Sequence, residues 1–576
     1  MSLRFPGASL ASISRNYERP MSPDQAPSFV PADYQPPLPV DRFVINEPPD
    51  DEAVPLDVLF VGGGPAGLAG AIELARLARA DAEAGGPLGE LEIGVLEKSA
   101  DLGEHCLSGA VVNPEPFREL FPELSDGEFP FRGPVAAERV YMLSEGRHVR
   151  LPTPPSMHNK GNYVASICEI VRWLGERAEE LGVNVFTGFP AESLLVEGQR
   201  VTGVRTTPSG LNRDGEPGSG FMPPTDLTSR VTVLCDGSRG SLSQAYMEWQ
   251  DIRSGNPQIF ALGVKELWQT RRPLDAVVHT LGWPLPSDAF GGSWMYPMGE
   301  DLVSLGLVVG LDYEDASLDV HDLLQRMKRH PLFEPYFEGG EMVEWGAKTI
   351  PEGGYYSLPA RLHGDGVLLA GDAAGMVNVA ALKGIQYAVQ AGIFAARTAF
   401  QALKADDTSA ERLRAYDALV WDSPIQSDLY RTRNQRLAFK NGFIGGGIRA
   451  SLLELTRGGF PGGPINVDQD ADEPRSPGAG TPITADGSLT FSKLDAVFRS
   501  GNATRDDIPS HLIVGDGVTP EVADFYSHLC PAGVYERKND ELVVNAPNCI
   551  DCKATDVVGP RWTPREGGSG PSYKRM

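Results

Sequence analysis

Three of the six cysteines, Cys530, Cys549 and Cys552, lie close together near the end of the sequence. Cys549 and Cys552 form a C-x2-C pair, which places two thiolates on one tight loop. Cys530 comes directly before a proline and supplies a third sulfur from further away. Soft thiolates select iron–sulfur clusters or zinc, and ferredoxin-type sites combine C-x2-C spacing with a cysteine before proline. The pattern therefore predicts a metal centre in this part of the chain.

A glycine-rich turn near the start, Gly62-Gly-Gly-Pro-Ala-Gly67, fits the spacing G-x-G-x-x-G between an apolar run and a helical stretch. Gly62 makes the tight turn, Gly64 lets the backbone approach a pyrophosphate, and Gly67 lets the helix pack on the strand. The helix N-terminus adds partial positive charge. Glu97 closes the next strand and is placed to accept hydrogen bonds from an adenosine ribose. The turn predicts a dinucleotide site.

Two later motifs decide between NAD and FAD. Asp236 and Gly237 resemble the Asp-Gly fingerprint of the flavin hydroxylase and reductase superfamily. Gly371 and Asp372 resemble the late Gly-Asp motif of that superfamily, in which the aspartate contacts the FAD ribityl chain. The three motifs follow one another in the expected order, and the middle of the chain has no second G-x-G-x-x-G between a strand and a helix. We therefore predict FAD, without a dedicated nicotinamide domain.

The chain resembles the electron-transfer flavoprotein–ubiquinone oxidoreductase family, from the strand before Gly62 almost to its end. The stretches that carry the resemblance are 107–110, 279–285, 291–293, 305–313, 383–384, 530–536 and 566–571. The resemblance implies that reduced electron-transfer flavoprotein delivers electrons to an iron–sulfur cluster and FAD, which pass them to a membrane quinone. It also implies FAD contacts for Lys383 and Gly384, and a quinone loop at Phe290, Gly291 and Gly292.

The sequence departs from that family at one cluster ligand. Where the family has its fourth cysteine, this chain has Thr555, whose neutral hydroxyl is a poor ligand for iron. Four outcomes stay open. The site holds a [4Fe–4S] cluster whose fourth iron is bound by Thr555, Asp556 or solvent, or it holds a three-cysteine [3Fe–4S] cluster. Otherwise it is degenerate and empty, or it binds zinc with the help of His528.

Charge and hydropathy limit the remaining partners. Lys and Arg total 51 against 77 Asp and Glu, so the net charge is −26 and nucleic acid is excluded as a partner. No apolar run approaches the ~20 residues of a membrane span. A quinone enzyme must nevertheless touch the bilayer, which implies a peripheral place on the inner face of a bacterial membrane or the matrix side of the mitochondrial inner membrane. The candidate membrane face consists of Arg431, Arg433, Arg436, Lys440, Phe443, Ile444, Ile448, Leu452 and Leu453.

The predicted fold class is α/β. We expect a Rossmann-like FAD-binding domain of the glutathione-reductase and hydroxylase type, an interleaved antiparallel-sheet quinone domain and a small ferredoxin-like iron–sulfur module. The expected boundaries are a proline-rich, disordered extension at 1–50, the FAD domain at 51–250 and 360–440, and the quinone domain at 251–359. A membrane-facing segment and linker at 441–490 leads to the iron–sulfur module at 491–576. Residues 113–155 are expected to form loops over the flavin domain, and 208–226 a hairpin tip.

Two rival functions fit parts of the sequence. The first is an FAD hydroxylase or polyprenyl-type reductase, which would leave the cysteines without a role. The second is a flavoprotein whose degenerate or zinc-clipped C-terminus binds a partner. His279, His363 and His511 lie near no nucleophile or carboxylate motif and are expected to be structural.

Overall fold

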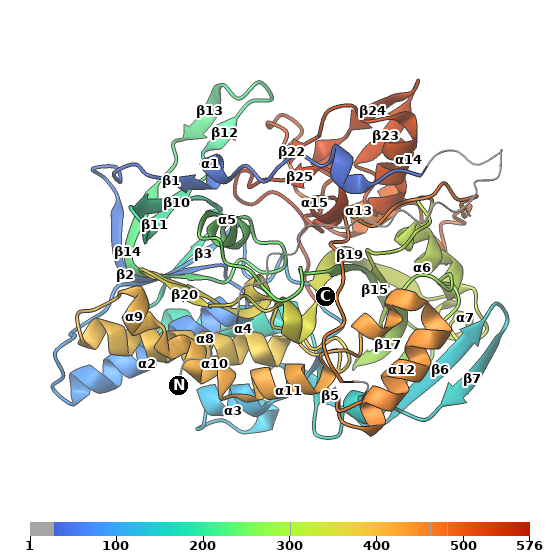
Figure 1. The fold of residues 1–576 in the computed structure, drawn as a ribbon, viewed down its shortest axis with the longest axis horizontal. Helices are drawn as coiled ribbons and strands as arrows, with labels where there is room; N and C mark the ends of the chain where they lie inside the picture. The colour runs from blue at the N-terminus through green and yellow to red at the C-terminus, as the bar shows by residue number, and fades with distance from the viewer. Residues whose placement is uncertain (1–27, 300, 461, 481) are drawn as a thin grey trace.

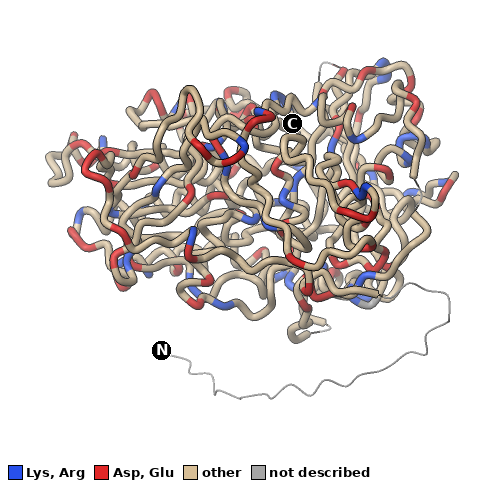
Figure 2. The backbone as a smooth tube through the Cα atoms, turned by 90° about the horizontal axis from the view of Figure 1, so that it is seen from above, with Lys and Arg blue, Asp and Glu red and all other residues tan. Residues whose placement is uncertain are grey.

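The computed structural model describes residues 28–299, 301–460, 462–480 and 482–576, and two β-sheets with a C-terminal module make up its body (Figure 1). The larger sheet lies on the left of the view and the second sheet on the right. The C-terminal module, drawn in red, lies over the second sheet. Lys and Arg are interspersed with Asp and Glu along the backbone, so the acidic excess is not confined to one segment (Figure 2).

The larger sheet is built around parallel strands that are apolar on both faces, as expected where helices cover a sheet. Its strands lie in the order β1 (Val44–Ile45), β10 (Ala191–Glu197), β11 (Arg200–Thr206), β14 (Asp226–Leu234), β2 (Val54–Val61), β3 (Ile93–Glu97) and β9 (Asn184–Thr187), with β21 (Val367–Leu369) and β20 (His363–Gly364) paired beside β14. The helices α2 (Pro65–Glu83), α4 (Ile167–Glu180) and α8 (Ile385–Lys404) lie below it in Figure 1. The βαβ unit β2–α2–β3 confirms the dinucleotide-type fold predicted for the glycine turn.

The second sheet is mainly antiparallel, which confirms the prediction for this part of the chain. Its order is β19 (Glu341–Pro351), β15 (Phe260–Gln269), β18 (Leu302–Gly310), β17 (Gly291–Gly299), β16 (Val277–Gly282), β6 (Glu138–Ser144) and β7 (Arg147–Leu151). The prediction of loops over 113–155 is therefore wrong for 138–151, where the chain forms β6 and β7. β6 pairs in parallel with β16 and buries Val140 and Leu143, so this excursion from the FAD domain completes the other sheet.

Shorter elements fill the space around the sheets. The predicted hairpin is confirmed as β12 (Ser209–Leu211) with β13 (Pro217–Met222), and β4 (Val111–Val112), β8 (Tyr163–Ala165) and β5 (Phe131–Pro134) form a small sheet. The remaining helices outside the C-terminal module include α3 (Glu115–Leu120), α5 (Ser241–Trp249), α6 (Val320–Lys328), α7 (Glu334–Phe337), α9 (Ala410–Leu413), α10 (Ala415–Trp421), α11 (Pro424–Thr432) and α12 (Phe443–Leu455).

The N-terminal extension is ordered over the part that the structure describes. Residues 1–27 lie outside the described residues, but α1 (Val40–Phe43) packs on the larger sheet and β1 pairs in parallel with β10. Phe43 is buried in the same core as the flavin-domain strands. The expectation of a disordered segment is therefore wrong for 28–50, because apolar side chains anchor a stretch that its prolines suggested was free.

The segment expected as a linker also packs tightly in one place. Arg475 is fully buried and donates to the carbonyl of Leu311, and Asp470 accepts from the backbone N–H of Phe260 at 2.7 Å. The module beyond it consists of α13 (Lys493–Arg499), β22 (Leu512–Ile513), α14 (Pro520–Leu529), β23 (Tyr535–Lys538), β24 (Glu541–Val544), α15 (Ala554–Val558) and β25 (Arg561–Trp562). Its apolar residues share one core with the second sheet, so the module is docked rather than tethered.

Candidate functional site

A cavity of about 560 Å³ lies where the two sheets and the C-terminal module meet. Most of the predicted cofactor and quinone residues line it: Gly62, Gly64, Glu97, Asp236, Gly237, Phe290, Gly291, Gly292, Asp372, Lys383 and Gly384. Gly67 and Gly371 are absent from the lining, and each is next to or near a lining residue in the chain. The structure thus gathers positions more than 300 residues apart in the sequence around one space.

The glycine turn at the head of α2 has the shape of a phosphate cradle. Gly62 has φ +120°, and a Cβ there would lie 2.4 Å from the carbonyl oxygen of Cys235. A Cβ at Gly67 would lie 2.1 Å from the oxygen of Gly62, so helix and turn touch through bare backbone. At Gly64 a Cβ would meet nothing within 4 Å, which leaves open space on the side of the cavity. This geometry fits a pyrophosphate at the helix N-terminus.

Two acidic side chains of the cavity wall, Glu97 and Asp236, are oriented by hydrogen bonds and can accept from hydroxyl groups. Glu97 accepts from the Ser99 hydroxyl at 2.8 Å and from the Gly63 N–H at 3.1 Å. One oxygen of Asp236 accepts from the backbone N–H groups of Leu242 and Ser243, at 3.1 and 3.2 Å. Its other oxygen is buried and has no hydrogen-bond partner among the described residues. A buried acceptor without a partner needs a donor, and a sugar hydroxyl of bound FAD would supply one. The residues present fit FAD.

Burial also shifts the ionisable groups of the wall. It raises the pKa of Asp372 to about 6, against the opposing effect of Lys348. Burial lowers the pKa of Lys383 to about 8 and that of Lys553 to about 7, and it also lowers the pKa of Lys348. A negative group in the cavity would favour the charged form of these lysines. The site therefore suits an anionic cofactor.

The raised pKa of Asp372 predicts a pH-dependent stability. An unfolded aspartate ionises near pH ~3.9, whereas Asp372 in the folded protein ionises at about pH 6. The free energy of unfolding therefore falls as the pH rises from about 4 to about 6, and it stays lower above that range. We expect Asp372→Asn to raise the Tm of FAD-stripped protein by about 2 °C or more at pH 8, and to change it little at pH 4. Thermal melts at both pH values check this. Asp214→Asn, on the exposed hairpin, is the control, and an equal shift at both pH values would contradict the assignment.

The cysteines come together in the C-terminal module. Cys530 ends α14, and Cys549 and Cys552 lie on a loop turned by positive φ angles at Asp551 (+55°) and Lys553 (+62°). All three thiols are free and buried, and burial raises the pKa of each, to about 12 for Cys549. The neighbouring thiols of Cys530 and Cys549 add to the shift at Cys552, which indicates that the three lie close together. Cluster assembly would displace their protons.

Thr555 is linked to the thiols through Tyr535. Its hydroxyl lies 3.4 Å from the Tyr535 hydroxyl. Burial raises the pKa of Tyr535 well above its usual value, the hydrogen bond to Thr555 opposes this shift, and the nearby thiols of all three cysteines add to it. Both side chains are buried. The structure thus brings together three thiols and one neutral hydroxyl, a donor set that fits three corners of an iron–sulfur cluster and not the fourth.

Asp551, which was not predicted as a site residue, is a buried carboxylate beside the cysteines and pairs with two cations. It accepts from Lys98 at 2.6 Å, from Arg565 at 2.8 Å and from the Trp562 indole N–H at 3.1 Å. Although burial alone would raise the pKa of Asp551, Arg565 and Lys98 hold it well below its usual range. The only sequence hint to this role is its position inside the C-x2-C loop.

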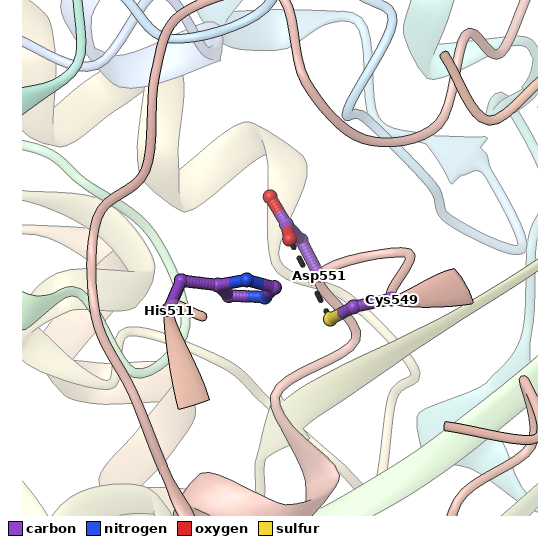
Figure 3. A group of neighbouring side chains, drawn as sticks. All are labelled: His511, Cys549 and Asp551. Atoms are coloured by element: carbon purple, nitrogen blue, oxygen red, sulfur yellow. Dashed lines mark hydrogen bonds between the residues drawn. The ribbon is translucent and has the colours of Figure 1, made fainter. Parts of the chain in front are cut away.

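His511 points toward Asp551 and Cys549 (Figure 3). Ligand atoms of the three residues lie within 4.8 Å of one another. Neither ring nitrogen of His511 has a hydrogen-bond partner in the described part of the chain, and burial holds the pKa of the ring well below its usual value. The expectation that His511 is merely structural therefore overlooked its place next to a cysteine of the centre.

One strand joins the cysteine loop to the cavity. The N–H of Thr349 on β19 donates to the carbonyl of Cys552 at 3.0 Å, and the Lys348 ammonium donates to the carbonyl of Asp551 at 3.2 Å. Lys348, Thr349 and Lys553 all line the cavity. The loop that carries two of the cysteines is therefore part of the cavity wall. Lys553 could have been found from its position after Cys552, whereas Lys348 lies mid-strand with no sequence signal.

The cavity also reaches the predicted quinone loop. The Phe290 ring lies 5.0 Å from the Phe439 ring, and the Arg436 guanidinium lies 4.2 Å above it. A Cβ at Gly291, whose φ is +154°, would lie 2.1 Å from the carbonyl oxygen of Val308, so the strand admits only glycine there. Phe290, Gly291, Gly292 and Phe439 together form one slot of the cavity wall.

The expected membrane face is only partly exposed. Arg436 is buried and pairs with Glu352 at 2.6 Å and Asp312 at 2.9 Å, so its prediction as a headgroup contact is wrong. Leu453 is buried too, because α12 turns that side inward. Ile444 and Ile448, by contrast, are 79% and 63% exposed. Among the described residues, no helix has the length and apolar character needed to cross a bilayer.

Comparison with known proteins identifies the family. Residues 487–574 match the family model described as electron transfer flavoprotein-ubiquinone oxidoreductase, 4Fe-4S, and residues 260–350 match ETF-QO, ubiquinone-binding. The mitochondrial electron transfer flavoprotein-ubiquinone oxidoreductase of Oryza sativa subsp. japonica is 38% identical, over 91% of this chain and 94% of the relative. The chain belongs to the electron transfer flavoprotein-ubiquinone oxidoreductase family.

Further relatives agree with this membership of the electron transfer flavoprotein-ubiquinone oxidoreductase family. A probable member from Acinetobacter baylyi is 34% identical, over 91% of this chain and 99% of the relative. Among solved structures, a geranylgeranyl bacteriochlorophyll reductase-like protein from Thermoplasma acidophilum aligns with a TM-score of 0.55 at 19% identity, over 70% of this chain and 92% of that one. This likeness concerns the fold alone, and it confirms the predicted α/β class.

Proposed function

We propose that the protein takes electrons from reduced electron transfer flavoprotein and passes them through an iron–sulfur centre and FAD to a membrane quinone. The observation that carries this proposal is that the cysteine loop forms part of the cavity wall. The carbonyl of Cys552 accepts a hydrogen bond from the backbone N–H of Thr349, which lies on β19 and lines the cavity. FAD supplies the chemistry that joins one-electron and two-electron carriers. The family relatives named for this activity support the same assignment.

The tasks left to the protein are positioning, exclusion of water and proton supply. The glycine turn, Glu97, Asp236 and Asp372 are assigned to FAD, and Lys553 and Lys348 to the stretch between the two centres. Reduction of a quinone to a quinol consumes two protons with the two electrons. Lys383, whose pKa burial lowers to about 8, lines the cavity and can supply a proton near neutral pH.

His279 is assigned a positioning role at the quinone end. It lines the cavity, and its Nε2 lies 2.7 Å from the Tyr296 hydroxyl. Burial lowers the pKa of His279 to about 3, so the ring is neutral. A neutral imidazole held by a tyrosine can offer one hydrogen bond to a quinone carbonyl without adding charge to the slot beside Phe290 and Gly291.

The direct test is spectroscopic and chemical. Purified protein should contain FAD, iron and acid-labile sulfide, its flavin should bleach on mixing with reduced electron transfer flavoprotein, and it should then reduce a soluble quinone analogue. Protein with full FAD content that electron transfer flavoprotein does not reduce would refute the proposed donor. Iron-free, zinc-containing protein would refute the relay.

We further propose that α12 rests on the bilayer that holds the quinone. Ala450 on this helix and Phe439 just before it line the cavity, while Ile444, Ile448 and Leu455 face outward. An apolar helix face dips into the acyl boundary without crossing the membrane. The proposed location is therefore peripheral, on the inner face of a bacterial membrane or the matrix side of the mitochondrial inner membrane.

A double substitution tests the membrane contact. Ile444→Glu with Ile448→Glu should weaken binding to anionic phospholipid vesicles at least about tenfold, because burying each isoleucine contributes about 1.5–3 kcal/mol and the new charges repel the headgroups. Vesicle co-sedimentation measures this. Phe498→Glu, at an 82% exposed residue on α13 of the C-terminal module, is the matched control and should bind normally. Equal loss in both variants would argue against α12 as the contact.

A further inference from the structure

The cysteine site raises the question of what binds its fourth iron, since only three thiols are present. A cubane cluster offers four irons, each of which takes one protein ligand, and soft thiolates are the ligands it prefers. Cys530, Cys549 and Cys552 satisfy three corners. The buried side chain that shares their space from the start of α15 is Thr555, with the Tyr535 hydroxyl 3.4 Å away.

The two nearby carboxylates, Asp551 and Asp556, are already hydrogen-bonded to other groups. Asp551 is held by Lys98, Arg565 and the Trp562 indole. Asp556 accepts from the Arg239 guanidinium at 2.8 Å with one oxygen and from the Trp562 backbone N–H at 3.0 Å with the other. Withdrawing Asp551 would leave the buried Arg565 guanidinium unpaired, and withdrawing Asp556 would leave the half-buried Arg239 guanidinium unpaired, which is destabilising in both cases. Asp556, which the sequence left open as a ligand, is therefore not available to iron.

His511 does not fill the fourth corner either. One of its ring nitrogens lies within 4.8 Å of Cys549 Sγ and of an Asp551 carboxylate oxygen, so His511 lies beside the corner that Cys549 already occupies (Figure 3). At that distance the ring makes no hydrogen bond to either group, and both of its nitrogens are without a partner among the described residues. A neutral group beside a ligand tunes that ligand's surroundings without replacing it.

We propose that the cluster of this protein has one exchangeable iron, at the corner beside Thr555, and that the protein converts between four-iron and three-iron forms. This inference rests on the proposed function, because it concerns the cluster of that relay. When a one-electron oxidant is present, the four-iron cluster releases one ferrous ion and gives one electron to the oxidant. The three-iron cluster stays on the three cysteines with all four sulfides. Ferrous ion and a reductant reverse the step.

The experiment uses the anaerobically purified holoenzyme, ferricyanide as oxidant, iron and sulfide analysis per FAD, and electron paramagnetic resonance. Iron should fall from about four to about three per FAD with sulfide unchanged, and the signal of an oxidised three-iron cluster should appear. Added ferrous ion with dithiothreitol should restore the fourth iron. Thr555→Cys should keep about four irons through the same treatment and give no such signal, whereas Thr555→Ala should behave like the parent protein.

Retention of all four irons by the parent protein would overturn the proposal, as would loss of iron from Thr555→Cys to the same extent. Nitrogen hyperfine coupling from a directly bound histidine, abolished in His511→Ala, would also overturn it. These outcomes differ from failure of the proposed function. If the protein holds four stable irons and is reduced by electron transfer flavoprotein, the proposed function stands and only the proposal of an exchangeable iron is refuted. A protein without sulfide would refute both.

Discussion

Alanine in place of Cys549 is expected to abolish electron delivery from electron transfer flavoprotein to quinone while FAD stays bound. The substitution leaves two thiols and a hydroxyl, too few to hold a cluster. Changes to outer contacts of metal sites alone cost about 10–100-fold, so loss of a ligand should lower the rate by more than about 100-fold. The rate of quinone reduction driven by reduced electron transfer flavoprotein measures it, together with iron per FAD.

The control for Cys549→Ala is Cys168→Ala. Cys168 is equally buried, but it lies outside the cavity lining, and its thiol donates to the carbonyl of Cys106. Removing it creates a small void without touching the centre, so iron content and rate should stay near those of the parent protein. A Cys549→Ala variant that keeps both its iron and its rate would exclude this cysteine as a ligand.

The second large effect is expected at the glycine turn, where two neighbouring glycines should fail differently. A methyl group at Gly64 meets no protein atom within 4 Å, so Gly64→Ala should fold with a nearly unchanged Tm. The methyl group would stand where backbone must approach the pyrophosphate, and we expect FAD affinity to fall about 10–100-fold, equivalent to about 1.4–2.8 kcal/mol. Titration of the FAD-stripped variant with FAD measures the loss.

Gly62→Ala provides the contrast. Its methyl group would collide with the Cys235 carbonyl at 2.4 Å, and φ +120° is strained for alanine, so the variant should lose stability even without FAD. Thermal unfolding of both stripped variants separates the two effects. If Gly64→Ala melted as early as Gly62→Ala, the open space at Gly64 would not be the phosphate site.

Local patterns sufficed to predict much of this molecule. The turn at Gly62, the helix after it and the strands at 259–265 and 303–309 follow from glycine spacing and apolar runs, which are short-range properties. The cysteine loop was found in the same way, because its ligands lie within a few residues. The comparison with relatives confirmed the family that these motifs indicated.

Long-range pairing could not be read from the sequence. β6 begins at residue 138 and pairs with β16, which begins at residue 277, and nothing in the composition of β6 indicates that partner. Arg436 looked like a surface cation because its carboxylate partners, Asp312 and Glu352, come from other elements. Lys348 is hidden for the same reason, since an inward-facing lysine is recognisable only once the cavity beside it is known.

The C-terminal module also has a protective consequence. Lys553, Trp562 and Pro564 form part of the cavity wall, so a chain without this module would open the flavin site to water. Reduced flavin exposed to water meets dissolved dioxygen, and electrons meant for the quinone would instead produce superoxide and peroxide. The module that carries the cysteines therefore also shields the flavin site, and damage to it would divert electrons from quinone to dioxygen.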